Sequence, residues 1–307
     1  MIEQRIVGSI AADTLVTFPQ GSVRGSSRIL HAETFETTDG PLAVVVTQQT
    51  PFHPVSRNWP DQPGDTGIIT VGPHVLTVVD CITGAVDLEH QTLLLGEGLR
   101  ARRGEPGWAF VVAHVVLVPA CGADALLGRD ATLEVDVTRR HQLSSAHSAC
   151  HLAALALNKA TRDLWRKDAP RDSIGNPDFD QLAIVESRIL LDGSMDRYRL
   201  GRSLRRRGFD SAALLARLDD IGSILTDQAR AWLALSPRVT LSVPDGQLST
   251  PRAWECELPD GRARVACGGT HLRQLGGIGS LSVSLGPDTD GSQVVMRTTV
   301  RSGDPSG

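Results

Sequence analysis

The sequence contains few aromatic residues, no long apolar run and no beginning typical of a secreted protein. Phenylalanine, tryptophan and tyrosine make up only 4% of the 307 residues, so leucine, valine and alanine must build most of the interior. The best apolar run, Trp108 to Ala120, contains His114 and is too short to span a bilayer. No basic region followed by an apolar stretch stands at the N-terminus. We therefore expect a cytoplasmic protein with no membrane partner.

Cysteine is also scarce, and the five cysteines are scattered along the chain. Their odd number and spacing exclude the disulfide framework of a small secreted domain. We expect reduced thiols, of which at most one serves as a metal ligand. Cys150 lies on the same helix as His147 and His151, but we expect it to pack as a small core residue rather than to bind a metal.

The net charge of the chain is −4. A nucleic acid would therefore have to bind to a local cluster of basic residues, because the chain as a whole is not basic. One dense cluster is present, and it consists of arginines only: Arg197, Arg199, Arg202, Arg205, Arg206 and Arg207. A solvated helix face is the plainer interpretation of such a run, and phosphate binding is the alternative.

The length and the pattern of apolar residues predict two domains of an α+β protein. Residues 1–135 contain short β-branched runs separated by Gly, Pro and Asp, which favours a small β-barrel. Residues 136–300 mix helical and strand patterns and predict an α/β domain with a mostly antiparallel sheet and helices on one face. Residues 301–307 predict a disordered tail.

Within the second domain, a helix is expected to begin near Asp136. A second, long helix follows Asp210 as N-cap and ends before Pro237. Strands are expected over 182–185 and, in one common sheet, over 239–243, 264–265 and 281–285. The last of these alternates apolar residues with serine, as expected when helices cover one face of a sheet.

Two pairs of metal-binding residue types stand out in this domain. His147 and His151 are four residues apart, so on a helix they lie about 40° apart around the axis and point into the same space. Cys267 and His271 enclose two glycines, which favours a tight turn that brings both side chains toward one point. Together these residues form a nitrogen and sulfur set suited to Zn²⁺. A zincin protease is excluded because Ser148 stands where its HExxH motif requires glutamate.

Three further candidates lie in a proline-rich loop between strands of the first domain. His53, Asp61 and Gln62 belong to this loop, which runs from Thr50 to Gly67 and is too rich in proline for a regular ladder. A structural loop is one interpretation, and contact with a ligand held by the second domain is the other. Arg140 precedes His147 by seven residues, so it lies on nearly the same helix face and is either an exposed cation or an anion contact.

At this point three motifs resemble one family. Cys267-Gly-Gly-Thr-His271, followed by Gly276-Gly277-Ile278-Gly279, resembles the CGGTH…TGxIG block of alanyl-tRNA synthetase editing domains. Asp136-x-x-Arg139-Arg140 followed by HxxxH matches the helix of the same family, and Gln62-Pro63-x-Asp65-x-Gly67 resembles the end of its GGGQPxDxG loop. Without an aminoacylation domain, the chain is similar to the free-standing, AlaX-like editing proteins. It departs from them at Trp59-Pro60-Asp61, where the relatives have three glycines.

The resemblance implies a zinc-dependent aminoacyl-tRNA deacylase that hydrolyses the ester of a mischarged tRNA. Residues 136–300 would be the editing domain, with zinc held by His147, His151 and Cys267, and with His271 as fourth ligand or as base. The candidate catalytic residues are His271, Gln62 and Thr270, of which Gln62 and Thr270 would contact the amino acid. Arg140 and the 197–207 cluster, which includes Arg205 and Arg206, would contact the acceptor end of the tRNA. His53 and Asp61 would contact the substrate from the first domain. The substrate would be Ser or Gly on the alanine tRNA, or a threonine analogue such as fluorothreonine on the threonine tRNA.

Two other classes of function stay open from the sequence. One is a zinc-stabilised module that binds tRNA without hydrolysis, and the other is a metal-dependent hydrolase of small esters or amides. The sequence also leaves open whether the protein is a monomer or a dimer.

Overall fold

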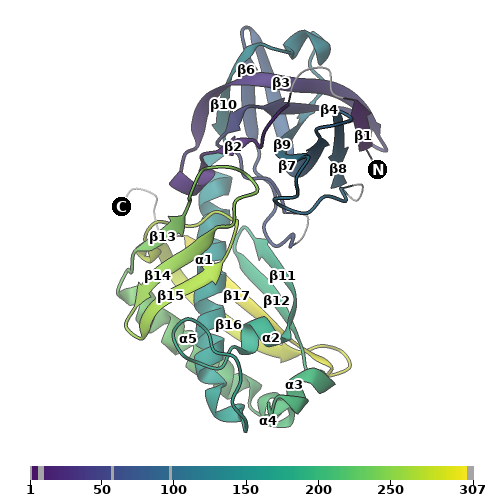
Figure 1. Cartoon of the computed structure of the whole chain (residues 1–307). Helices are drawn as coiled ribbons and strands as arrows, with labels where there is room; N and C mark the ends of the chain where they lie inside the picture. The colour runs from purple at the N-terminus through teal and green to yellow at the C-terminus, as the bar shows by residue number, and fades with distance from the viewer. Residues whose placement is uncertain (1, 6–9, 57–58, 97–98, 303–307) are drawn as a thin grey trace. The chain divides into compact units, whose positions relative to one another are not determined.

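The computed structural model describes residues 2–5, 10–56, 59–96 and 99–302. The chain divides into two compact units (Figure 1). Unit 1 comprises Met1–Arg140 and Val243–Arg252, and unit 2 comprises His141–Ser242 and Ala253–Gly307. The described part is a mixture of helices and antiparallel sheets, which confirms the predicted α+β class.

Unit 1 is built around one sheet whose described strands pair antiparallel in the order β1-β8-β7-β6-β10-β3-β4-β9. The strands are β1 (Ile2–Arg5), β3 (Arg24–Thr37), β4 (Gly40–Thr47), β6 (Gly67–Val71), β7 (His74–Asp87), β8 (Thr92–Leu95), β9 (Trp108–Leu117) and β10 (Asp130–Val135). β9 also pairs with β7, so the pairings run from β7 through β6, β10, β3, β4 and β9 and return to β7. β2 (Leu15–Val16) and β5 (Gln49–Thr50) form a separate parallel pair, and the short 3-10 helices are η1 (Phe18–Gln20) and η3 (Asp124–Leu126).

Apolar residues cover both faces of this sheet near its middle. In β4, Ala43 and Val45 pack in one core cluster with Phe52, while Val44 and Val46 pack in another. Because successive strand residues point to opposite faces, a strand buried on both sides must be apolar without interruption. This is why the run 42–47 could be predicted. β3 is longer but mostly polar and only partly buried, so no periodic apolar signal marks it.

Unit 2 contains the helices and two antiparallel sheets. Helix α1 (Val137–Ala160) begins in unit 1 and continues through unit 2, followed by η4 (Arg162–Leu164), α2 (Phe179–Ala183), α3 (Arg202–Arg206), α4 (Ser211–Ala216), α5 (Leu218–Ala234) and η5 (Leu275–Gly277). The larger sheet has the order β11-β12-β17-β16, with β11 (Ile184–Leu190), β12 (Gly193–Arg199), β17 (Gln293–Ser302) and β16 (Ile278–Pro287). The smaller sheet pairs β13 (Val239–Ser242), β14 (Ala253–Leu258) and β15 (Gly261–Ala266).

Helix α1 is the central element of unit 2. Every residue from Leu143 to Cys150 is buried, so this part of the helix has no solvent-facing side. A helix in this position must be apolar or small all round, which explains its alanine-rich sequence. The polar side chains within this stretch therefore need partners inside the unit, and most of them belong to the site described below.

Several predicted elements of unit 2 are confirmed and others are corrected. Leu281, Val283 and Leu285 of β16 are buried while the serines between them are exposed, as the alternation predicted. The predicted long helix is two helices, because Arg217 leaves helical geometry between α4 and α5. Residues 182–183 are the end of α2 rather than a strand.

The predicted common sheet is also wrong. β13 and β15 share the smaller sheet, whereas β16 belongs to the larger one. The predicted tail begins too early, since β17 extends to Ser302, and the rest of the tail, 303–307, lies outside the described residues.

Candidate metal centre

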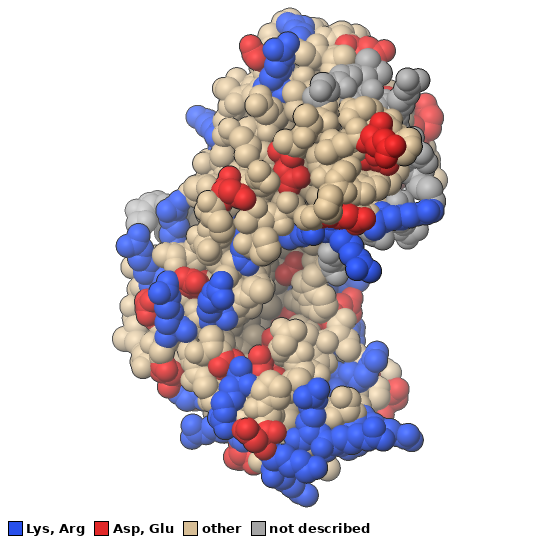
Figure 2. All heavy atoms as spheres, in the orientation of Figure 1, with Lys and Arg blue, Asp and Glu red and all other residues tan. Residues whose placement is uncertain are grey.

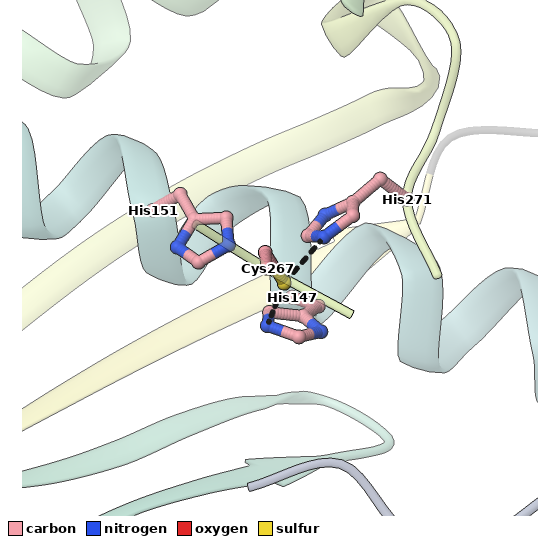
Figure 3. Close-up of side chains that lie close together, drawn as sticks. All are labelled: His147, His151, Cys267 and His271. Carbon is pink, nitrogen blue, oxygen red and sulfur yellow. Dashed lines mark hydrogen bonds between the residues drawn. The ribbon is translucent and has the colours of Figure 1, made fainter. Parts of the chain in front are cut away.

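Four side chains of unit 2 converge on one point (Figure 3). They are the predicted set, His147, His151, Cys267 and His271, and one potential ligand atom from each lies within 4.8 Å of the others. The sulfur of Cys267 is 3.5 Å from His147 Nε2 and 3.2 Å from His271 Nε2. The structure thus brings together pairs of residues that are separated by more than a hundred positions in the sequence.

Helix α1 supplies the two histidines from its buried middle. Because His147 and His151 are one helical turn apart, their rings lie on the same face, with centroids 4.8 Å apart. Trp254 of β14 packs beside the imidazole of His151, and the centroids of the two rings are 5.3 Å apart. The geometry of the helix therefore fixes the relative positions of His147 and His151, independently of the loop that carries Cys267 and His271.

The loop after β15 supplies the other half, and α1 fixes its position. The backbone N–H of Gly269 points at the Cys267 sulfur at 3.4 Å, which is the tight turn that the two glycines predicted. Ser148 donates a hydrogen bond to the carbonyl of Ser144 and accepts one from the backbone N–H of Leu272 at 3.1 Å. A single hydroxyl on α1 thereby ties down the chain next to His271.

Ser148 also sets the tautomer of His271. Its oxygen lies 3.4 Å from His271 Nδ1, and its own proton is used by the Ser144 carbonyl. The imidazole Nδ1–H is then the donor to Ser148, which leaves the lone pair of Nε2 directed toward Cys267. An outer hydrogen bond of this kind is the usual way in which proteins orient a metal-binding histidine. In the sequence, Ser148 served only to exclude a protease, and its i, i+4 relation to Ser144 was the signal that could have indicated this role.

The electrostatics of the cluster favour a thiolate at Cys267 and a neutral imidazole at His271. Burial raises the pKa of the Cys267 thiol, but His147, His271 and His151 together outweigh burial and hold that pKa well below its ordinary value. Burial lowers the pKa of His271 to about 3, against the opposing effect of Cys267. A thiolate and an unprotonated imidazole are the forms in which Cys267 and His271 would bind a metal.

The residues fit a divalent metal ion such as zinc. Among the described residues, the buried Nε2 atom of His151 has no hydrogen-bond partner, a costly situation unless a ligand meets it. Three imidazoles and one thiolate are a donor set that zinc accepts in four-coordinate sites. The group could therefore hold a metal ion, and its chemistry is consistent with the predicted zinc.

Two neighbours of the cluster have other roles. Thr270 is buried and accepts a hydrogen bond from Ser144 at 2.8 Å, so its hydroxyl connects the loop to α1. Cys150 belongs to the core cluster, as predicted, and its sulfur lies 3.6 Å from the buried carboxylate of Asp196. Asp196 also accepts hydrogen bonds from Ser187 and Ser194. This carboxylate was not predicted, because a lone aspartate in a strand has no sequence pattern that marks it as buried.

The candidates of the proline-rich loop all lie in unit 1. His53 and Gln62 are buried and Asp61 is half-buried. Among the described residues between β5 and β6, the bridge between Val55 and Ile82 is the only strand-like pairing. His53 packs its ring edge-on against Phe18, with centroids 5.1 Å apart. The predicted contacts of His53, Asp61 and Gln62 with a substrate stay predictions.

Arg140 is buried in unit 1, with only 6% of its surface exposed. Its guanidinium pairs with Asp65, with Nε 3.0 Å from Oδ1, and donates to the carbonyl of Pro51 at 2.8 Å. These contacts give Arg140 a structural role, and its predicted contact with tRNA stays a prediction. Arg205 and Arg206, by contrast, are exposed on α3.

No known family model matches the chain. Within the described residues, none of the helices combines the length and the apolar character required to cross a membrane.

Proposed function

We propose that this protein is a zinc-dependent deacylase that hydrolyses the ester bond of a mischarged aminoacyl-tRNA. One observation carries the proposal: two of the three motifs on which the family resemblance rests converge in a single cluster of one thiol and three imidazoles. The proposed architecture includes a small barrel in unit 1, which is supported by strand pairings that return to β7.

The reaction adds water across an ester. Water attacks the carbonyl carbon, the bond from that carbon to the ribose oxygen breaks, and the ribose oxygen takes a proton to become a free hydroxyl. A bound zinc ion would lower the pKa of a water molecule to about 7 and polarise the ester carbonyl. His147, His151 and Cys267 would hold the metal, and His271 would join them through Nε2 because Ser148 occupies Nδ1.

The remaining predicted residues act on the substrate in this proposal. Thr270, fixed by Ser144, keeps the Cys267–His271 loop in place and offers a hydroxyl beside the cluster. Gln62 would contact the amino acid, and the altered Trp59-Pro60-Asp61 segment would adapt specificity. The amino acid would be serine, glycine or a threonine analogue such as fluorothreonine, each on a tRNA made for another residue.

A panel of charged tRNAs tests this proposal. The protein is incubated with Ser- and Gly-tRNA for alanine, with Thr- and fluorothreonyl-tRNA for threonine, with the correct Ala-tRNA, and with free aminoacyl esters. We expect rapid loss of charge from one mischarged tRNA and slow loss from the correct one. His147→Ala should lower that rate on the order of 100-fold or more. His141→Ala is the matched control on the same helix, because His141 lies outside the cluster.

A second candidate function is favoured by the number of ligands. Four protein donors within 4.8 Å of one another can fill a tetrahedral zinc shell, which is typical of structural rather than catalytic sites. In that case the protein would bind tRNA and zinc but release no amino acid from any member of the panel. Hydrolysis of the free esters without preference for tRNA would instead indicate a small-ester hydrolase.

A further inference from the structure

Unit 2 carries a second basic segment that the sequence did not single out. Residues 162–171, which follow α1, contain four cations within ten positions: Arg162, Arg166, Lys167 and Arg171. All four are exposed. They line one pocket of about 500 Å³, together with Trp165, Asn176 and one carboxylate, that of Asp168.

This segment lies directly beside α3. The backbone N–H of Arg166 donates to the carbonyl of Gly208 at 2.9 Å, and Lys167 Nζ donates to the carbonyl of Arg206 at 3.2 Å. Trp165 packs its ring against Phe209, with centroids 4.9 Å apart. Two basic stretches that are about 35 residues apart in the sequence therefore form one surface, here called the basic surface: residues 162–171 and 202–207.

Much of the positive charge on this surface is not neutralised within the chain. Arg166 pairs with Asp210, and Arg171 pairs with Asp168. Among the described residues, however, no ion pair holds Lys167, Arg202, Arg206 or Arg207. Figure 2 shows Lys and Arg crowded over the end of unit 2 that carries α3. In a chain with net charge −4, such a local concentration of unpaired cations favours an anion as the ligand of this surface.

The chemistry of the surface favours a nucleic-acid backbone over an anionic membrane. All but one of its cations are arginines, whose planar guanidinium matches the oxygens of a phosphate. Membrane-binding surfaces combine cations with exposed apolar side chains. Neither 162–171 nor 202–207 contains an exposed large hydrophobic residue, since Leu164 and Leu204 are both buried.

The surface is also separate from the metal cluster. His151 and the end of α1 at Ala160 are nine residues apart, which corresponds to about 14 Å along a helix axis. The basic segment begins after that end. A molecule that places one end at the cluster and still contacts this surface must therefore be extended, as a polynucleotide is.

We propose that the basic surface binds the phosphate backbone of an RNA, away from the end whose ester the cluster would hydrolyse. This inference rests on the proposed function for its choice of tRNA as the RNA. Its contacts go to phosphates, so they add affinity without reading sequence. Arg205 and Arg206 then act on the body of the tRNA rather than beside the amino acid.

Binding of uncharged tRNA at several salt concentrations tests the proposal. R206E/R207E should raise Kd about tenfold, and it should reduce the dependence of log Kd on log salt by about 1 to 2. R297E/R301E is the matched control, because both arginines are exposed on β17 and the change in net charge is the same. We expect the control to change Kd less than about twofold. Lys167→Gln should weaken binding in the same direction as R206E/R207E.

Equal Kd and equal salt dependence for R206E/R207E and the native chain would overturn the inference. So would equal losses in the control, or binding to vesicles of phosphatidylserine and phosphatidylcholine that the substitution abolishes while tRNA binding persists. The proposed function is measured separately, by hydrolysis of an aminoacyl ester without a tRNA body. The native chain can then fail to hydrolyse any ester while the surface still binds tRNA, or the reverse.

Discussion

At the scale of single residues, Ser148 is the side chain on which the geometry of the metal cluster depends most directly. It is not a ligand, but it holds both His271 Nδ1 and the backbone of Leu272. Ser148→Ala should lower zinc affinity about 10- to 100-fold, because the imidazole loses its fixed orientation. Competition with a chromophoric chelator measures the change.

A matched control exists on another helix. Ser223 of α5 makes the same hydrogen bond to the carbonyl four residues earlier, but it is exposed and far from any ligand in sequence. Ser223→Ala should leave zinc affinity unchanged. Equal affinity in Ser148→Ala and the native chain would show that His271 is oriented by the metal alone.

His114 in unit 1 should make stability depend on pH. It is fully buried, its Nδ1–H donates to the Val45 carbonyl, and its Nε2 accepts from Thr50. Burial lowers its pKa to about 4 from 6.5. Between these values the unfolded chain binds the proton and the folded chain does not, so the free energy of unfolding falls as the pH decreases. The loss reaches about 3 kcal/mol near pH 4.

Urea unfolding from pH 7.5 to 4.5 measures this effect. His114→Gln cannot titrate, so its stability should fall less steeply with acidification than that of the native chain. His74→Gln, a half-buried histidine in β7, is the control. Parallel pH profiles for the native chain and His114→Gln would contradict the prediction.

At the scale of elements, Arg140 joins the start of α1 to the proline-rich loop. Its ion pair with Asp65 is buried, and removal of one partner from a buried pair leaves an uncompensated charge. Arg140→Met should therefore lower the free energy of unfolding by about 3–5 kcal/mol. Its neighbour Arg139 is half-buried, so Arg139→Met should cost much less. Denaturant unfolding compares the two, and similar costs would mean that the pair does not hold the loop.

The elements of the fold differ in how well they can be predicted from the sequence. The uninterrupted apolar run of β4 and the i, i+4 spacing of the histidines in α1 are local signals, and both elements were predicted from them. β3 and β12 are polar, and each pairs with a strand that is distant in the sequence, β10 and β17 respectively, which local patterns do not encode. The break at Arg217 has neither glycine nor proline to mark it, so packing within unit 2 must set it.

The metal cluster was predictable because each half is local, and each half was read correctly. Its supporting residues were not, since Ser148, Trp254 and Asp196 acquire their roles only when three elements meet. Arg140 is a further example. Its ion-pair partner Asp65 is 75 residues away in the chain, so the sequence position of Arg140 beside the histidines did not indicate this pair.

At the scale of the whole molecule, the two units have separate cores, and only one holds the metal cluster. Zinc at about 100 times its Kd should stabilise the unit that binds it by about 2.7 kcal/mol. Removal of zinc with a chelator should therefore lower the unfolding temperature of unit 2 and leave that of unit 1 in place.

Differential scanning calorimetry of the full chain, with and without chelator, measures both transitions. The profile of Cys267→Ala should not respond to the chelator, which makes it the control. A single transition that moves as a whole on chelation would show that the two units unfold together.

The segment Val243–Arg252 has a consequence for any attempt to divide the molecule. It leaves unit 2 after β13, places Leu248 in the core of unit 1, donates the N–H of Ser249 to Asp13, and returns to unit 2 at β14. If the gene were divided after residue 140, the N-terminal product would lack Leu248, which is buried in the core of unit 1. The C-terminal product would keep residues 243–252 as a loop without the core against which Leu248 packs. Separate production of the halves would require a circular rearrangement or a grafted turn, rather than a simple truncation.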